Sequence, residues 1–305
     1  MRRTPGRVVA AVAVGCVLLM LLHGLVPNGA GHPGSLLRTF LPWTGLSVPV
    51  LLAAALVLRS RLAVAAALLP AVAWGCLFAG TLADKRGGGG ELTVVSHNVD
   101  ENNPDPARTA RALAASGADV LALQELSAAS AGVYERELAA RYPYRSVHLG
   151  VGLWSRYPLD GVETVPIMPW TRAVRAAVDT PRGPVAVYAV HLASVRVTAD
   201  AGFATGRRDD SARKLGEALR AEPLPRVLVV GDFNGTAEDP ALRPATSGLR
   251  SAQRESGAGF GFTWPAAFPM VRIDQVLLKG MAPVSAWTLP ATGSDHLPVA
   301  ASVRL

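Results

Sequence analysis

The chain has few cysteines, and most of its length carries no excess of charge. Cys16 and Cys76 are the two that occur, both lie inside apolar stretches, and residues 91–305 contain none. Cysteines in apolar surroundings are typical of small buried hydrophobic side chains. The sequence therefore predicts neither a disulfide framework nor a cysteine-based metal site. The absence of cysteine from residues 91–305 is compatible with any redox compartment.

Acidic residues are almost missing from the first 90 residues, and this decides where the net charge resides. That segment has eight Lys and Arg residues against one acid, Asp84, which accounts for the whole formal net charge of +7. Residues 91–305 carry 22 basic and 22 acidic residues, so their formal charge is zero. A basic chain is typical of nucleic-acid binders, but here the excess flanks apolar segments. The composition excludes a global basic bias in 91–305 and leaves room for a local patch.

Three long apolar runs fill the first 90 residues. Each approaches the roughly 20 residues that a membrane-spanning helix needs. Basic residues before the first run resemble the start of a signal peptide. Two further runs and the lack of a small-residue cleavage pattern before Asn28 favour three retained transmembrane helices instead. The runs cover residues 8–26, about 40–58 and about 62–82.

Basic residues at the ends of these runs predict an orientation. Positive charge concentrates on the cytoplasmic side of membrane proteins. The N-terminus and the loop between the second and third runs therefore belong in the cytoplasm, and residue 83 onward belongs outside. The basic residues after the third run weakly favour the opposite orientation. We expect a multi-pass protein of the cell membrane with an extracytoplasmic remainder. The residues are Arg2, Arg3 and Arg7, then Arg59 and Arg61 in the loop, and Lys85 and Arg86 after the third run.

Four glycines at residues 87–90 separate an anchor, residues 1–90, from a domain of residues 91–305. We expect this glycine run to be a flexible linker. In the domain, strands outnumber helices and often come in consecutive pairs, which predicts an α/β fold with mixed sheets packed between helices. The expected strands are 92–96, 119–123, 145–155, 161–166, 172–179, 184–191, 226–231, 271–278, 283–288 and 298–304, and the expected helices are 105–117, 130–141 and 210–221.

Polar side chains follow several expected strands where each strand ends, which is where a rigid sheet commonly presents functional loops. Taken singly, most have an ordinary explanation, such as a turn residue, a helix-entry charge or a satisfied core histidine. Asp274 is the most informative, because a carboxylate in an apolar strand needs a partner to offset its desolvation, and His296 is a candidate partner. The residues are Asn98, Glu125, His191, Asp232, Asn234, Asp274, Asp295 and His296.

Together and in this order, the segments closely resemble the endonuclease/exonuclease/phosphatase superfamily over residues 91–305. The resemblance rests on SHNV, LQEL, LWSRYPL, VHLAS, GDFNG, RIDQVLL and GSDHLPV. It implies a four-layer α/β sandwich, with two central mixed sheets flanked by helices and a site at one edge. It also implies a Mg²⁺ or Mn²⁺ ion and hydrolysis of a phosphate ester by this domain.

The resemblance assigns part of the set to metal and phosphate binding. Glu125 resembles the principal metal ligand, with Asn98 and Asp295 near the metal. His191 resembles the histidine that contacts the scissile phosphate in secreted nuclease and sphingomyelinase branches. We expect His191 to be protonated when phosphate is bound.

The remaining residues are assigned to water activation. Asp232 and Asn234 resemble the pair that positions the nucleophilic water and the phosphate. Asp274 and His296 resemble a carboxylate–histidine dyad. We favour His296 as the general base, with Asp232 as the competing choice.

Four residues outside the motifs are weaker candidates for substrate binding. Two arginines are expected on one face of the strand after Trp170, a third follows in the segment after His191, and a tryptophan precedes the Asp274 strand. A solvated charge run or a packed loop explains them at least as well. They are Arg172, Arg175, Arg207 and Trp264.

The substrate stays open at this level. The superfamily covers nucleases, phospholipid and sphingomyelin phosphodiesterases and inositol-phosphate phosphatases. Zero net charge disfavours a non-specific DNA-degrading enzyme, and a tether to the bilayer mildly favours a lipid headgroup or another cell-surface phosphoester. An extracytoplasmic nuclease acting on DNA or RNA is the alternative, and a non-catalytic membrane-tethered binding domain is a third hypothesis. No protein partner is predicted.

Overall fold

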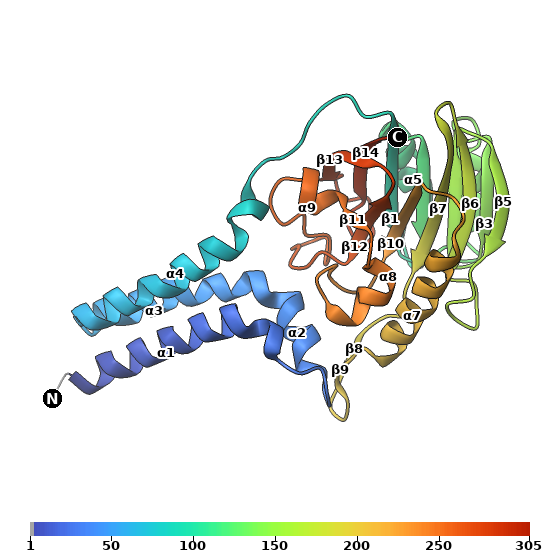
Figure 1. Ribbon diagram of the computed structural model, residues 1–305. Helices are drawn as coiled ribbons and strands as arrows, with labels where there is room; N and C mark the ends of the chain where they lie inside the picture. The colour runs from blue at the N-terminus through green and yellow to red at the C-terminus, as the bar shows by residue number, and fades with distance from the viewer. Residues whose placement is uncertain (1–2) are drawn as a thin grey trace. The chain divides into compact units, whose positions relative to one another are not determined.

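The structure is a computed structural model that describes residues 3–305. Arg2, one of the arginines used to predict the orientation, lies outside the described residues. The chain forms two compact units, one of Met1–Ala83 with Val197–Phe203 and one of Asp84–Arg196 with Ala204–Leu305. The first corresponds to most of the apolar third of the sequence (Figure 1).

Long apolar helices form the first unit. In the described part of the chain, three segments are long and apolar enough to cross a membrane: Thr4–Leu25, Pro33–Val57 and Arg61–Leu82. Many of their large apolar side chains are exposed, which is unfavourable in water and fits a lipid surrounding. The helices are α1 (Arg3–Leu22), α2 (Pro33–Phe40), α3 (Ser47–Val57) and α4 (Arg61–Leu82), with 3-10 turns η1 (His23–Leu25) and η2 (Leu41–Leu46).

The middle segment is broken, whereas the sequence predicted one helix over about 40–58. It consists of α2, η2 and α3 in succession. Pro42 and Gly45 lie in η2, and proline has no N–H to donate while glycine weakens a regular helix. The indole Nε1 of Trp74 donates to the carbonyl oxygen of Pro42 at 2.7 Å, so one carbonyl at the break has a partner.

Two mixed six-stranded sheets form the centre of the second unit, as far as the described residues go. Sheet A has the order β13-β14-β1-β2-β4-β3, and sheet B has the order β11-β12-β10-β7-β6-β5. The pairs β1–β2 and β10–β7 are parallel. The strands are β1 (Leu92–Asn98), β2 (Val120–Gln124), β3 (Tyr144–His148), β4 (Val151–Ser155), β5 (Leu159–Thr164), β6 (Ala173–Thr180), β7 (Gly183–His191), β10 (Val227–Asp232), β11 (Arg250–Ser251), β12 (Asp274–Lys279), β13 (Ala282–Thr288) and β14 (Val299–Arg304), and a short pair β8 (Arg196–Thr198) and β9 (Gly202–Ala204) follows β7.

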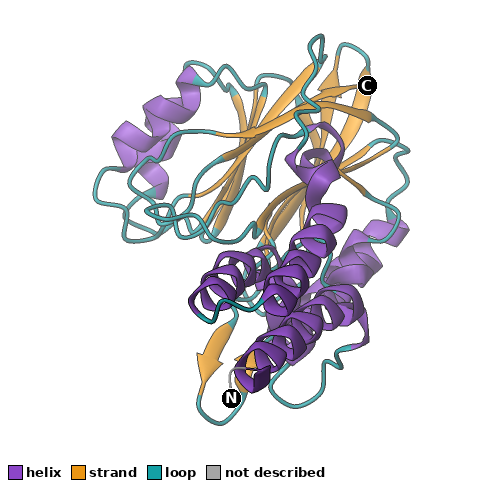
Figure 2. Ribbon diagram, turned by 90° about the vertical axis from the view of Figure 1, so that its left-hand side faces the viewer, coloured by secondary structure: helices purple, strands orange, loops and turns teal. Residues whose placement is uncertain are grey.

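Apolar side chains on both faces of each sheet build four layers. One core lies between the sheets and joins residues such as Val94 of sheet A and Val187 of sheet B. A second core packs α7 and α8 onto the outer face of sheet B, and a third packs α5 and α6 onto the outer face of sheet A. The expected four-layer α/β sandwich is confirmed, and its strands are orange in Figure 2. The helices are α5 (Pro106–Ala115), α6 (Ala131–Leu138), α7 (Gly206–Ala221), α8 (Arg243–Thr246) and α9 (Ala252–Ser256), with a 3-10 turn η3 (Pro240–Leu242).

Strand periodicity decides which side chains enter the layer between the sheets. Along β1, Leu92 and Val94 belong to this layer, while Val95 packs with the helices outside sheet A. The same two-residue alternation carries Leu228 and Val230 of β10 into the layer. Polar residues that continue this alternation at the strand ends therefore also point between the sheets.

Two strand predictions differ from the structure. Residues 145–155 form the hairpin β3–β4 instead of one strand, because the chain reverses at Gly150, whose φ of +94° suits glycine. Asp274 is the first residue of β12 and does not lie inside a longer strand over 271–278. A carboxylate at a strand end can reach a loop partner, which an interior position would not allow.

The glycine run at 87–90 was predicted to be a flexible linker, whereas in the structure it contacts the strands of the domain. The N–H of Gly87 donates to the carbonyl oxygen of Val284 at 2.8 Å. A Cβ on Gly90 would lie 1.7 Å from Oγ of Ser302. Glycine is therefore required at position 90 by a close approach to β14, in addition to its conformational freedom.

Candidate active site

Asn98 connects two carboxylates that come from different sheets. It is the last residue of β1, in step with Val94, and is 1% exposed. Its Nδ2 lies 3.0 Å from Oε1 of Glu125 and 3.1 Å from Oδ2 of Asp232, and donates to both. Its Oδ1 accepts the N–H of Asp100 at 3.1 Å. The amide thus holds Glu125 and Asp232 side by side at the edge of the layer between the sheets.

Three residues at this edge have left-handed backbones. Glu125 follows β2 with φ of +60°, Asp100 follows β1 with φ of +61°, and Asn234 follows β10 with φ of +48°. Such a conformation in a residue other than glycine costs of order 1–3 kcal/mol, and it concentrates at functional sites. For Glu125, which lacks the short side chain that helps Asn and Asp adopt this region, the strain is most informative.

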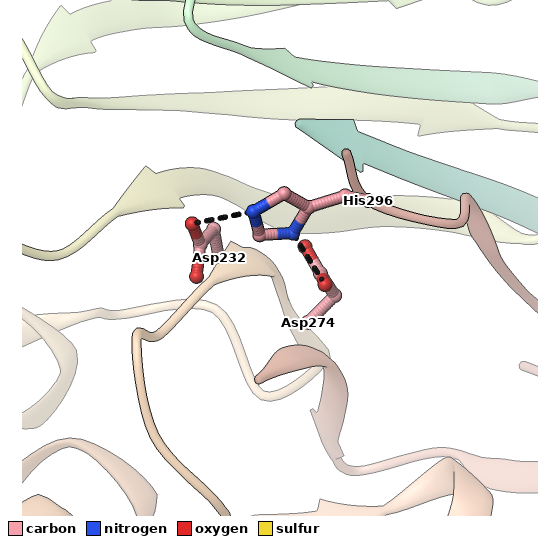
Figure 3. A group of neighbouring side chains, drawn as sticks. All are labelled: Asp232, Asp274 and His296. Atoms are coloured by element: carbon pink, nitrogen blue, oxygen red, sulfur yellow. Dashed lines mark hydrogen bonds and ion pairs between the residues drawn. The ribbon is translucent and has the colours of Figure 1, made fainter. Parts of the chain in front are cut away.

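A carboxylate–histidine pair lies beside this group. Nδ1 of His296 is 2.9 Å from Oδ2 of Asp274, and its Nε2 is 3.9 Å from Oδ2 of Asp232. Figure 3 shows the imidazole ring between the two carboxylates. Burial lowers the pKa of His296, but the charge and hydrogen bond of Asp274 outweigh this and raise it. Burial raises the pKa of Asp232, and the charge of His296 opposes that rise. The two residues therefore set each other's protonation.

His191 lies against an arginine. It ends β7 in register with Asp232 and is fully buried. Nη1 of Arg172 is 3.0 Å from its Nε2 and also contacts Nδ1. Nε2 of His191 is 3.5 Å from Oδ2 of Asp232 and 3.7 Å from Oε1 of Glu125.

The surroundings of His191 favour a neutral ring. Burial lowers its pKa well below the ordinary value, and the charges of Arg172 and His296 lower the pKa further. A guanidinium can only donate, and a neutral imidazole has one acceptor nitrogen, so only one of the two ring nitrogens that Nη1 contacts accepts from it. We expected a protonated His191 with phosphate bound, whereas here the positive charge beside the ring belongs to Arg172.

The structure also brings Asn234, Asp295 and Trp264 to the site. The N–H of Asn234 donates to Oδ1 of Asp232 at 2.8 Å, and its Nδ2 donates to the carbonyl oxygen of Leu192 at 3.0 Å. Asp295 is more exposed, with Oδ1 3.9 Å from Nε2 of His296. Trp264 donates its indole N–H to Oδ2 of Asp295 at 3.0 Å. Trp264 therefore contacts an acid of the site directly.

Arg175 is the exception among the predicted residues. Successive strand residues alternate between faces, so Arg172 and Arg175, three positions apart, cannot share one face. Arg175 pairs with Tyr188 on the side of sheet B that faces α7, and its guanidinium bonds both carboxylate oxygens of Glu222 at 3.0 and 2.9 Å. The prediction that it faces substrate with Arg172 is wrong.

The burial of Arg208 was not predicted from the sequence. Arg208 in the first turn of α7 is fully buried, and its Nη2 bonds Oδ2 of Asp239 at 2.7 Å. Its Nη1 donates to the carbonyl oxygen of Asn234 at 3.3 Å and supports the turn after Asp232. From the sequence, Arg207 or Arg208 is a candidate to reach a phosphate, with a solvated charge run as the favoured interpretation, and the helical phase that buries only the second was the available signal.

The donor set suits a hard divalent cation. Carboxylate and amide oxygens are the ligands that Mg²⁺ prefers, and one or two carboxylates are enough. Glu125 and Asp232 converge on Nδ2 of Asn98, and Oδ1 of Asp274 is buried without a partner among the described residues. Single ligand atoms of Asp232, Asp274 and His296 lie within 4.8 Å of one another and form a second candidate group. Because Asp274 and His296 already bond each other, Glu125 is the better candidate for the principal ligand.

A comparison with family profiles identifies the fold. The profile described as the Endonuclease/Exonuclease/phosphatase family matches residues 95–296. The chain belongs to this family. Its members are metal-dependent hydrolases that act on phosphoester bonds, so the chain is a hydrolase of this class. A comparison with curated proteins finds no match.

Solved structures share the fold at low sequence identity. D. rerio TDP2 complexed with a single-strand DNA product is 20% identical with a TM-score of 0.58, and covers 70% of this chain and 99% of its own. Sphingomyelinase C from Streptomyces griseocarneus is 20% identical with a TM-score of 0.52, over 69% and 98%. Beta toxin from Staphylococcus aureus with bound magnesium ions is 15% identical with a TM-score of 0.54, over 70% and 99%. At this identity the likeness shows the fold, and the substrates of these proteins differ.

Proposed function

We propose that the chain is a membrane-anchored, divalent-metal-dependent phosphoesterase that hydrolyses a phosphodiester or phosphomonoester by in-line attack of water. The observation that carries the proposal is the convergence of Asn98, Glu125, His191, Asp232 and His296 from both sheets at one edge. These groups can hold a cation, move a proton and bind phosphate oxygens. A non-catalytic binding domain would have no need for the strained backbone at Glu125.

Glu125 would hold Mg²⁺ or Mn²⁺, with Asn98 and Asp295 beside it. A bound cation neutralises phosphate charge, polarises the ester and stabilises the leaving oxygen. Asn98 fixes the Glu125 carboxylate through its Nδ2 and keeps it next to Asp232. The left-handed backbone at Glu125 turns its side chain out of the strand direction, toward this edge.

Asp232, Asn234 and His296 would position and deprotonate the attacking water. His296 is held by Asp274 at Nδ1, which leaves Nε2 directed toward Oδ2 of Asp232. We favour Nε2 of His296 as the proton acceptor, and Asp232 is the competing choice. Although burial lowers the pKa of His296, Asp274 raises it to about 10, so the ring must lose its proton before it can accept one from water. Imidazole added to a His296→Ala variant distinguishes them, because it restores turnover only if the missing ring moves the proton.

Arg172 and His191 would bind the phosphate oxygens. The guanidinium supplies fixed positive charge, and a neutral His191 can donate one N–H to an oxygen of the phosphate. Burial lowers the pKa of Arg172, while the charges of Glu125 and Asp232 raise it. The arginine therefore stays cationic at neutral pH and is already oriented before substrate arrives.

The apolar helices of the first unit would tether the enzyme to a bilayer as an anchor of residues 1–90, with the catalytic domain of residues 91–305 on the extracytoplasmic side. Three described segments are long and apolar enough for this role. A tether raises the concentration of the site near membrane phosphoesters, which keeps lipid headgroups among the candidate substrates beside nucleic acid and small phosphoesters.

The test uses the full chain in detergent with bis-p-nitrophenyl phosphate. We expect hydrolysis with Mg²⁺ or Mn²⁺, and its loss with chelator. The variants Glu125→Gln and His296→Ala are expected to lower kcat by at least about a hundredfold, the lower range for a catalytic acid or base. Glu217→Gln, an exposed carboxylate on α7, is the matched control. Near-normal turnover in either site variant would contradict this mechanism.

A further inference from the structure

An aromatic side chain and a cation lie together next to the site. Trp170 precedes β6 and is 49% exposed. The guanidinium carbon of Arg207, in the first turn of α7, is 5.8 Å from the centroid of the Trp170 ring. This cation–π contact joins two segments that are distant in sequence and holds both side chains at the surface.

Arg172 connects this pair to the scissile-phosphate position. It follows Trp170 by two residues, so their Cα atoms are within about 8 Å. Its guanidinium contacts His191. Burial lowers the pKa of Arg172, and the charge of Arg207 lowers it as well. Positive charge therefore extends from His191 outward to Trp170.

Arg172 and Arg207 differ in the acidic residues near them. Arg172 is near Glu125, Asp232 and Glu101. Arg207 is exposed, and within residues 3–305 no salt bridge includes it. It is therefore available to an anion of the substrate, at a position outside the scissile phosphate.

This chemistry discriminates between the substrates of the family. A choline headgroup carries a quaternary ammonium that needs an aromatic surface without neighbouring cations, and here Arg207 already lies over Trp170. A nucleic-acid strand carries a second phosphate one nucleotide away and a planar base that stacks on an indole or on a guanidinium plane. The zero net charge of residues 91–305 makes a local patch of this kind necessary for binding a polyanion.

We propose that Trp170 and Arg207 form a subsite for the nucleotide next to the scissile phosphate, with the base on the exposed part of the Trp170 ring that Arg207 leaves open and the adjoining phosphate on Arg207, so that the substrate is a single nucleic-acid strand. The proposal rests on the proposed phosphoesterase function and adds its substrate class. It assigns Arg172 to the scissile phosphate and Arg207 to the neighbouring one.

Binding and turnover test it separately in the full chain in detergent. Fluorescence anisotropy with a short labelled oligothymidylate, in the presence of chelator, measures binding without hydrolysis. We expect Trp170→Ala and Arg207→Gln each to raise Kd by about tenfold. Arg207→Gln is also expected to reduce the slope of log Kd against log salt by about 0.7, the value for one phosphate contact on a single strand. Arg213→Gln, an exposed arginine on the same helix, is the matched control and leaves both unchanged.

Turnover gives the second readout. The ratio of kcat/KM for oligothymidylate to kcat/KM for bis-p-nitrophenyl phosphate is expected to fall about tenfold in both variants. An unchanged Kd and an unchanged ratio would overturn the subsite. A wild-type preference for sphingomyelin in mixed micelles over oligothymidylate would overturn the nucleic-acid substrate in favour of a lipid. Absence of metal-dependent hydrolysis of bis-p-nitrophenyl phosphate would instead overturn the phosphoesterase function, while the binding result would still decide whether the subsite exists.

Discussion

Individual side chains at the edge between the sheets depend on one another for their position and charge. Asn98 has no charge of its own, yet its Nδ2 contacts a carboxylate on each side. The hydrogen bond from Asn98 lowers the pKa of Asp232, which burial raises, so loss of that donor would raise the pKa of Asp232 further. The amide therefore acts on the metal and proton chemistry of its neighbours.

Asn98→Leu tests this dependence. The variant keeps the branching at Cγ and removes the hydrogen bonds, so the affinity for Mg²⁺ or Mn²⁺ is expected to fall 10- to 100-fold, as is typical when a group that orients a metal ligand is lost. The apparent activation constant for each metal, from hydrolysis at saturating substrate, measures the change. Asn102→Ala, an exposed residue of the following loop, is the control. Unaltered metal activation in Asn98→Leu would contradict the role of the amide.

At this scale the sequence predicted most of the site. Asn98, His191 and Asp232 follow strongly apolar strands, and alternation along those strands carries them into the same layer. The dyad of Asp274 and His296 followed from the desolvation of a carboxylate in apolar surroundings. The lowered pKa of His191 could not be predicted, because it depends on burial and on the charge of Arg172, which precedes β6.

Buried polar contacts between separate segments of the chain hold helices against the loops of the site. The first turn of α7 carries Arg208, which reaches Asp239 in the loop before η3 and the carbonyl oxygen of Asn234. Arg208 and Asp239 are both fully buried. This pair fixes α7 to the turn after Asp232, and so it links helix packing to the geometry of the site.

Removing one partner of this pair is expected to destabilise the fold. Arg208→Met removes the guanidinium from the buried ion pair with Asp239, which should reduce the free energy of unfolding by about 3–5 kcal/mol. Arg213→Met on the same helix is exposed and should change it by less than about 0.5 kcal/mol. Urea titration in detergent, followed by tryptophan fluorescence, gives both values. Similar unfolding midpoints for the two variants would show that the buried pair is not stabilising.

The helices and strands also show how much of the fold could be predicted from the sequence. The long apolar strands and α5, α6 and α7 were predicted because periodicity and capping residues define them locally. The break in the middle apolar segment and the β3–β4 hairpin were missed, although Pro42, Gly45 and Gly150 mark them. The short elements β11, α8 and α9 were missed because they are held by packing against longer elements, which no local pattern reports.

The distribution of charge over the whole chain separates its two roles. The +7 net charge belongs to the first 90 residues, while residues 91–305 are neutral. If the apolar helices span a membrane as proposed, the basic residues around them set the orientation, and binding of a polyanion would depend on a few placed arginines of the second unit. A bilayer tether and a local patch such as Trp170 with Arg207 are compatible, since a tethered enzyme can act on soluble nucleic acid that reaches the cell surface.

The orientation is the prediction that decides where such a substrate must be. In the proposed topology two crossings precede Ser60 and three precede Gly90, so reporters fused after these two residues should lie on opposite sides. Alkaline phosphatase, which is active only outside the cytoplasm, is expected to be active after Gly90 and inactive after Ser60, and a green fluorescent protein should give the reverse. The two fusions control for each other's expression. A fluorescent fusion after Gly90 with an inactive phosphatase at the same position would place the site in the cytoplasm, and the accessible substrate would then be intracellular.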